Sequence, residues 1–258
     1  VMTYDRKSVA YQARTSNTPS SDLQDPSVPS RINGINSALA ANASQTSTMS
    51  ALINGQYGFD DRYMINASLR GDATSRLSSS QRYGLFPAVS ARWRVSGEKF
   101  MSHFKFSKSI DDLSIRASYG RSGNAPKSDY MFYNRYDNLD WNYLGEAGVY
   151  SANMGLQKLK WETVIGQNLG FNLVMFKNRL NLDVEVYKNR TKDLFFYDLQ
   201  IASVNGFNKV DMNVGTMDNQ GWEINLNSTP VKTKMWQVDF NFNVARNENV
   251  IREISEFY

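Results

Sequence analysis

Apolar and polar residues alternate along several stretches of this chain. In residues 180–188 (LNLDVEVYK) aliphatic side chains occupy every second position, and Asp183 and Glu185 lie between them. The same alternation recurs at residues 222–227 and 236–244. Successive side chains of a strand point to opposite faces, so a period of two predicts strands with one apolar and one polar face.

About nine such strands are predicted. They cover approximately residues 1–14, 49–59, 63–70, 85–95, 112–121, 161–176, 179–197, 220–229 and 235–247. Residues 15–48 are rich in Ser, Asn, Ala, Thr and Pro, so we expect a long solvated loop there. Between two of the strands, Ser96 is placed to cap a short helical turn.

The connections between the predicted strands alternate in length. Tight polar turns are expected at Asp60, 177–179 and 230–234. Much longer connections are expected at residues 71–84, 122–160 and 198–218. Short turns on one side and long loops on the other are typical of outer-membrane barrels. We therefore expect an all-β fold, part of an antiparallel transmembrane β-barrel. A soluble carbohydrate-binding β-sandwich shares the alternation and stays open as an alternative.

Composition narrows the classes of function. The 258 residues include no cysteine, which excludes disulfides and cysteine-based metal sites. No apolar run approaches the roughly 18 residues of a membrane-spanning helix. The net charge of +4 is modest, with no basic helix or aromatic platform, so we expect no nucleic-acid binding. The chain starts at Val1 without a signal segment, and we expect it to be a piece of a longer protein.

The two faces of the strands suggest different surroundings. An Arg or Lys facing lipid at the bilayer midplane costs about 2 to 4 kcal/mol, so the polar face is expected to line the barrel lumen. The residues expected there are Arg116, Asp183, Glu185, Glu223, Asn225, Asp239 and Asn241. Those expected to meet lipid are Leu182, Val184, Val186, Trp222, Ile224, Leu226, Val238 and Phe240.

The long connection at residues 122–160 is the best candidate for ligand contact. Its candidate residues are Tyr130, Tyr133, Tyr136, Trp141, Asn142 and Tyr143. Aromatic faces beside polar groups suit a sugar ring or an extended peptide. Packing against the barrel mouth or against a partner lid is an equal alternative. The only histidine, His103, has no companion with metal-ligand or catalytic spacing, so we expect neither an enzyme nor a metal site.

Four segments resemble the barrel of SusC/RagA-type TonB-dependent outer-membrane transporters. They are DRYMINASLRGDATSRLSSSQRYGLFPAVSARWRVSGEKFM, LSIRASYGRSGN, LKWETVIGQNLGFNLVMFKNRLNLDVEVYKNRTKDLFF and NVGTMDNQGWEINL. They occur in the family's order across residues 62–226. Ala73 and Leu77 stand where the family usually has Gly and Phe, which affects only the turn of that loop.

The resemblance implies more than the residues alone. It implies that residues 1–258 are part of a plugged barrel of the 22-stranded class, with the plug domain and remaining strands outside this chain. The polar face would then also dock the plug. The resemblance further implies import of glycan or peptide fragments across the outer membrane of a Bacteroidota-type bacterium, without a cofactor. A SusD-like surface lipoprotein would cap the barrel, and the TonB complex would supply energy through the absent plug region. A structural barrel subunit of a larger outer-membrane assembly is the rival reading.

Overall fold

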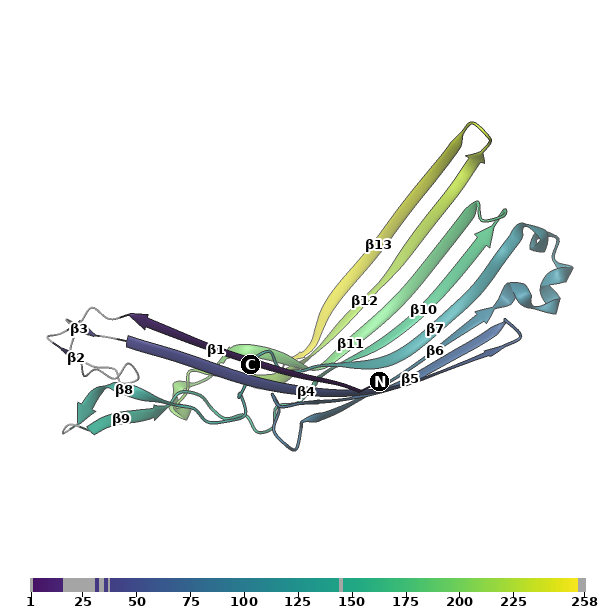
Figure 1. Cartoon of the computed structure of the whole chain (residues 1–258). Coiled ribbons are helices and arrows are strands. Elements are labelled where there is room, and N and C mark those ends of the chain that lie inside the picture. Colours follow the sequence, from purple (N-terminus) through teal and green to yellow (C-terminus); the bar gives the residue numbers. More distant parts are fainter. Residues whose placement is uncertain (1, 16–30, 33–34, 37, 144–145, 255–258) are drawn as a thin grey trace.

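The computed structural model describes residues 2–15, 31–32, 35–36, 38–143 and 146–254. A single antiparallel sheet of nine strands dominates it, in the order β1-β4-β5-β6-β7-β10-β11-β12-β13 (Figure 1). The strands of this sheet are β1 Met2–Thr15, β4 Ala38–Phe59, β5 Tyr63–Thr74, β6 Tyr83–Arg94, β7 Ile110–Asn124, β10 Glu162–Met175, β11 Leu180–Gln200, β12 Lys209–Lys232 and β13 Gln237–Ile254. The nine predicted strands are therefore confirmed.

Two small hairpins and four short helices complete the described part. The hairpins are β2 Arg31–Ile32 with β3 Ile35–Asn36, and β8 Tyr136–Tyr143 with β9 Glu146–Ser151. The 3₁₀ helices are η1 Val95–Gly97, η2 Lys99–His103, η3 Lys105–Ser109 and η4 Ser203–Asn205. No helix among the described residues is long and apolar enough to cross a bilayer.

The turns and the loops lie at opposite ends of the sheet, as predicted. The turns after β4, β10 and β12 and the helices η1 to η3 share one end, which we call the turn end (Figure 1). The β5–β6, β7–β10 and β11–β12 connections share the other, the loop end. This sidedness follows because every neighbouring pair of strands in the sheet is antiparallel.

The turn between β4 and β5 depends on residues that tolerate left-handed backbone. Asp60 and Asp61 have φ angles of 54° and 51°, and the Arg62 amide donates to the Phe59 carbonyl at 3.1 Å. Positive φ at both central residues is the geometry of a type I′ turn, whose twist matches that of the flanking strands. The paired aspartates of this turn thus have a conformational role.

Three predicted loops are wrong in extent. The connection predicted at 71–84 spans only residues 75–82, between β5 and β6. β11 continues to Gln200 and β12 begins at Lys209, so only residues 201–208 connect them instead of 198–218. The pairing shifts register three times between Thr191 and Leu199, and these irregularities break the period of two that marks a strand. Likewise, residues 38–48 extend β4 and pair with β1, although their small polar side chains indicated a loop.

The helical segment between β6 and β7 is confirmed, but its cap is wrong. Ser96 lies inside η1, and the residues before η1 and η2 make no side-chain capping bond. Instead, the Ser96 hydroxyl donates to Asp112 at 3.1 Å. A carboxylate on the neighbouring strand competes successfully for the hydroxyl because it is a charged acceptor.

The apolar face of the sheet is not covered by a second sheet in the described part of the chain, which contradicts the sandwich alternative. Val186 is 53% exposed and Phe240 also 53%. The buried apolar cluster lies instead under the loops, where Leu77, Met131 and Leu159 pack together. The long connections are thus anchored to the sheet by a small core of their own.

Candidate functional site

Arg116 is the centre of a polar network on one face of the sheet. Its Nη2 lies 2.9 Å from Asp183 Oδ2 and 2.9 Å from Glu185 Oε1. To reach these carboxylates on β11, the side chain crosses β10 directly over Gly170. A Cβ atom at that glycine would lie 3.0 Å from Arg116 Nε, so the absence of a side chain there leaves the guanidinium its path.

Asparagines of β10 extend the network to both sides. Asn168 Nδ2 donates to the second oxygen of Glu185 at 3.4 Å, and Asn172 Nδ2 donates to both Asn181 and Asp183 at 3.1 Å. The Arg116 side chain is 40% exposed. Exposed ion pairs contribute little to stability, typically about 0.2 to 1 kcal/mol. The network is therefore better suited to presenting fixed polar groups than to holding the sheet together.

The other predicted polar residues continue the same face. Glu223 lies opposite Glu185 in the strand register, and Asn225 lies opposite Asp183. On β13, Asn241 has the same strand parity as Asp239, whose carboxylate accepts bonds from Thr229 at 2.7 Å and Gln237 at 2.9 Å. On this part of the face the four carboxylates of Asp112, Asp183, Glu185 and Glu223 outnumber the three guanidinium groups of Arg92, Arg94 and Arg116, which leaves a small excess of negative charge. The predicted alignment of these residues on one face agrees with the register.

A second polar cluster lies at the turn end, around Glu98. Its Oε1 accepts hydrogen bonds from the Tyr63 hydroxyl at 2.5 Å and the Trp93 indole at 3.1 Å, and Oε2 pairs with Arg62 Nη1 at 3.1 Å. The pKa of Glu98 lies below its usual range, chiefly because of the hydrogen bond from the Tyr63 hydroxyl and next because of the one from the Trp93 indole. These contacts tie the η1–η2 segment to the first residues of β5. This carboxylate was not singled out from the sequence.

The base of the 122–160 connection is fixed to the sheet. Arg76 Nε donates to Asp129 at 2.8 Å, and Thr46 on β4 donates to the same carboxylate oxygen at 2.7 Å. The Tyr130 hydroxyl accepts from the Gln45 amide at 2.7 Å. Tyr130 is thus engaged in anchoring the loop.

The other predicted ligand residues of this loop differ from Tyr130. Tyr133 is 54% exposed and stacks on Phe132 with ring centroids 4.2 Å apart, and Tyr136 at the start of β8 is exposed. The side chains of Trp141, Asn142 and Tyr143 lie outside the described residues, although β8 includes their backbone. Contact of this loop with a ligand stays a prediction.

A third cluster, missed by sequence reasoning, surrounds Asp218 on β12. Its carboxylate is fully buried and pairs with Arg190 through two bonds of 2.7 and 2.8 Å, and with Arg252 at 3.0 Å. Residue 218 fell at the edge of a predicted loop. The available signal was the pair Lys188 and Arg190, which have the parity of the aliphatic residues of β11.

None of the clusters described above has the geometry of a metal site or a catalytic site. No group of three or more His, Cys, Asp or Glu side chains within the described ranges could hold a metal ion. His103 is exposed at the end of η2. The side chains of the Arg116 and Asp218 clusters form Arg–carboxylate and amide pairs, an arrangement suited to docking and lining surfaces.

Comparison with known proteins agrees with this two-faced wall. The model of the family described as TonB dependent receptor-like, beta-barrel, matches residues 3–254. The chain belongs to this family. The family is one of outer-membrane receptors and transporters rather than of enzymes, and the expected resemblance to SusC/RagA-type members is confirmed.

Individual relatives point the same way. TonB-dependent receptor P39 of Formosa agariphila is 34% identical over 200 residues, which are 78% of this chain and 19% of the receptor. TonB-dependent receptor SusC of Bacteroides thetaiotaomicron is 26% identical over 77% of this chain and 20% of its own length. This TonB-dependent receptor chain thus spans about a fifth of the curated relatives that it matches.

Solved structures confirm the fold. The RagAB peptide transporter superposes with a TM-score of 0.78 at 24% identity, over 99% of this chain and 28% of that one. The siderophore receptor PirA of Pseudomonas aeruginosa gives 0.53 at 13% identity, over 97% of this chain and 45% of that one. The nine-stranded sheet is therefore part of the wall of a TonB-dependent receptor barrel.

Proposed function

We propose that this chain is a section of a SusC-like importer that takes up glycan or peptide fragments through the outer membrane of a Bacteroidota-type bacterium. The observation that supports it most is the single two-faced sheet, with a polar network on one face and exposed aliphatic residues on the other. The family match and the SusC and RagAB likenesses supply the transport context.

In this proposal the polar face lines the lumen. Arg116, Asp183, Glu185 and Glu223 offer charged groups with an acidic surplus, which a plug inside the barrel can meet with basic and amide groups. The plug and the remaining strands belong to the rest of the full-length protein. Energy comes from the TonB complex acting on that plug.

A SusD-like surface lipoprotein is the proposed partner at the loop end. The anchored base of the 122–160 connection and the exposed Tyr133 and Tyr136 rings present an aromatic surface there. Such a surface stacks on a sugar ring or a peptide side chain, or packs against the lipoprotein. Substitution of these rings lowers the affinity for the ligand in the first case and the affinity for the lipoprotein in the second.

Uptake by cells tests the import proposal. A strain that lacks the full-length gene is complemented with it and given labelled oligosaccharides and labelled peptides, with and without dissipation of the proton-motive force. We expect energy-dependent uptake of one of the two classes, restored by the gene. Unaltered uptake of both classes, combined with loss of another envelope component from the membrane, would favour the structural-subunit alternative.

A loop variant separates ligand contact from lid contact. Replacing Tyr133, Trp141 and Tyr143 by Ala in the full-length protein removes aromatic surface while the strand ladder stays intact. Each stacking ring lost costs about 1 kcal/mol, so the triple change weakens ligand binding in calorimetry by well over tenfold. Normal ligand affinity with lost co-purification of the lipoprotein would assign the loop to the lid interface.

A further inference from the structure

The apolar face of the sheet changes character sharply on its way to the loop end. On β11 the outward series Leu182, Val184 and Val186 is followed by Lys188 and Arg190, which share their strand parity. On the neighbouring strands the same change occurs. β10 passes from Phe171 and Leu169 to Gln167, β12 from Ile224 and Trp222 to Gln220 and Asp218, and β13 from Phe242 and Val244 to Arg246 and Glu248.

The level of this change identifies a membrane boundary. Charged side chains on the lipid face are costly at the midplane of the bilayer and tolerated near its interfaces. The boundary lies toward the loop end of β11 and β12, and in such barrels the longer loops are extracellular. The charged residues therefore lie at the level of the lipid headgroups of the outer leaflet.

Positive charge exceeds negative charge in this region. Asp218 is fully buried, and three cations surround it: Arg190 at 2.7 Å, Arg252 at 3.0 Å and Lys188 at 3.8 Å. Their side chains remain between 42% and 46% exposed, so they are open to a further anion. Further charged residues on this face are Arg121, Lys192, Arg246, Glu248 and Glu253, three cations and two anions, which add to the excess.

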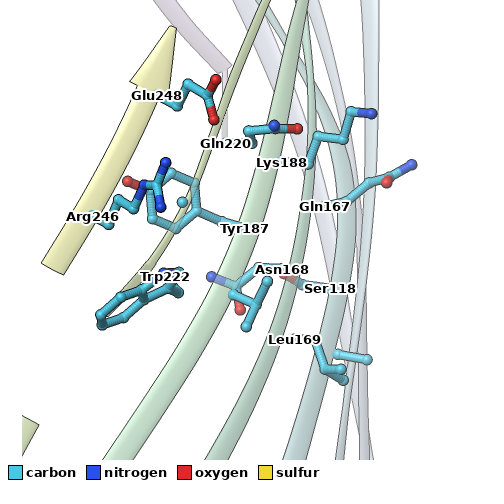
Figure 2. Close-up of a pocket in the computed structure, with 13 residues that line it drawn as sticks. Ser118, Gln167, Asn168, Leu169, Tyr187, Lys188, Gln220, Trp222, Arg246 and Glu248 are labelled. Atoms are coloured by element: carbon cyan, nitrogen blue, oxygen red, sulfur yellow. The ribbon is translucent and has the colours of Figure 1, made fainter. Parts of the chain in front are cut away.

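A groove of about 660 Å³ lies across the boundary. Its apolar end is lined by Leu169, Val186 and Trp222, and its charged end by the cations Lys188 and Arg246 together with one carboxylate, Glu248. Figure 2 shows Trp222 and Arg246 at the left, Leu169 at the lower right, and Lys188 in the upper part of the view near Gln220 and Gln167. The groove thus offers apolar contact and cationic donors within one continuous surface.

We propose that this groove binds one phosphorylated glycolipid of the outer leaflet, of the lipopolysaccharide class. Lys188 and Arg246 donate hydrogen bonds to a sugar-linked phosphate, while Leu169, Val186 and Trp222 contact the first segment of an acyl chain. The buried Asp218 positions the ends of Arg190 and Lys188 beside this phosphate. The inference rests on the lipid-facing orientation proposed above, and it is independent of what the transporter imports.

The chemistry favours a lipid over a soluble anion. A free phosphate would use only the cationic end and would leave the apolar lining in contact with water. A lipid whose headgroup lies at the same depth satisfies both ends at once. It also stays in the bilayer, so its effective concentration at the groove is high.

Direct lipid binding to the purified full-length protein tests this inference. The probe is bisphosphorylated lipid A in detergent micelles, read by native mass spectrometry and by titration of a fluorescent derivative. The double variant K188Q/R246Q should bind at least tenfold more weakly, since each basic residue near the surface contributes on the order of a few-fold to tenfold in affinity. The matched control K232Q/K234Q removes two charges at the turn end and should bind normally.

Three further arms decide the outcome. The conservative variant K188R/R246K should retain binding, and heat-modifiable gel mobility should be the same for all variants, which separates lost contacts from misfolding. Inorganic phosphate at millimolar concentration should not displace the lipid, and dephosphorylated lipid A should bind weakly. Equal affinity of K188Q/R246Q and the unmodified protein overturns the proposal. Full displacement by inorganic phosphate overturns it in favour of a soluble-anion site, and neither result depends on measured uptake.

Discussion

The Arg116 and Asp218 clusters use the same chemistry with opposite proportions. On the polar face, one half-exposed arginine is shared by two carboxylates, both at 2.9 Å. On the apolar face, one buried carboxylate is shared by three cations. The sign of the surplus differs accordingly, acidic inside the proposed lumen and basic toward the proposed headgroups. Burial of the shared group, rather than the number of ion pairs, therefore distinguishes a cluster that stabilises the fold from one that presents polar groups at the surface.

The largest difference between the two clusters is expected when a carboxylate of each is neutralised. Asp218→Asn leaves three cations beside a neutral group, so we expect a several-fold loss of folded full-length protein in membranes and a lower melting temperature. Glu185→Gln, the matched change on the polar face, should change both quantities little because Arg116 keeps Asp183. Heat-modifiable gel mobility measures the two variants side by side. Equal losses would mean that burial does not separate the clusters.

Glycine substitutions probe the polar cluster alone. Gly55→Ala should stabilise the barrel by up to about 1 kcal/mol, because no atom lies within 4 Å of the added carbon and a strand glycine is entropically unfavourable. At Gly170 the same carbon would lie 3.0 Å from Arg116 Nε, so displacement of the guanidinium should cancel that gain. Denaturant unfolding of both variants should therefore differ by about 1 kcal/mol. Equal stabilisation would show that Arg116 crosses β10 by another path.

The Glu98 cluster adds a pH-dependent case outside the strands. Its pKa is lowered in the folded protein, chiefly by the Tyr63 hydroxyl, so its stabilising contribution is fully present above the ordinary glutamate pKa of 4.5. That contribution is lost as the pH falls through the lowered folded value. Unfolding midpoints of the unmodified protein should drop more steeply below pH 4.5 than those of Glu98→Gln. Parallel pH profiles of the two proteins would contradict the assignment.

The smallest expected effect is the coupling between Arg116 and Asp183. Arg116→Ala, Asp183→Ala and the double variant form a mutant cycle, and a half-exposed pair should give a coupling of about 0.5 kcal/mol. Equilibrium unfolding of the full-length barrel in detergent provides the measurement. A coupling above about 2 kcal/mol would place this pair with the buried cluster instead.

The sequence predicted the sheet well where alternation is regular. Residues 180–188 have one aliphatic and one polar parity, and both faces and the register of β11 follow from that pattern. Two of the tight turns were equally readable because Asp60, Asp61 and Asn178 mark them, whereas the connection at 233–236 contains neither residue type. The polar face was found because its charges, such as Arg116 and Asp183, interrupt otherwise apolar strands.

Prediction failed where the period of two is interrupted or where chemistry crosses strands. Left-handed Asp198 and the register shifts around it hid the last three residues of β11, including buried Leu199, and residues 209–219 of β12. Asp218 was missed because its partners come from β11 and β13, far apart in sequence. Tyr130 looked like a ligand residue from its neighbours, and only the structure reveals its bond to Gln45.

One hydrogen-bonded row of residues constrains how such a wall is assembled. The row runs from Tyr57, near the turn end of β4, through Leu169 and Val186 to Trp222 and Arg246, in the loop-end half of β13. The row therefore moves toward the loop end from β4 to β13, mainly in two steps, between β6 and β7 and between β11 and β12. A slip of one residue would exchange the two faces, and a slip of two would preserve them but shift a strand by about 7 Å. The apolar band thus determines the depth of each strand in the bilayer during insertion, because only one register brings every strand's apolar segment to the same level.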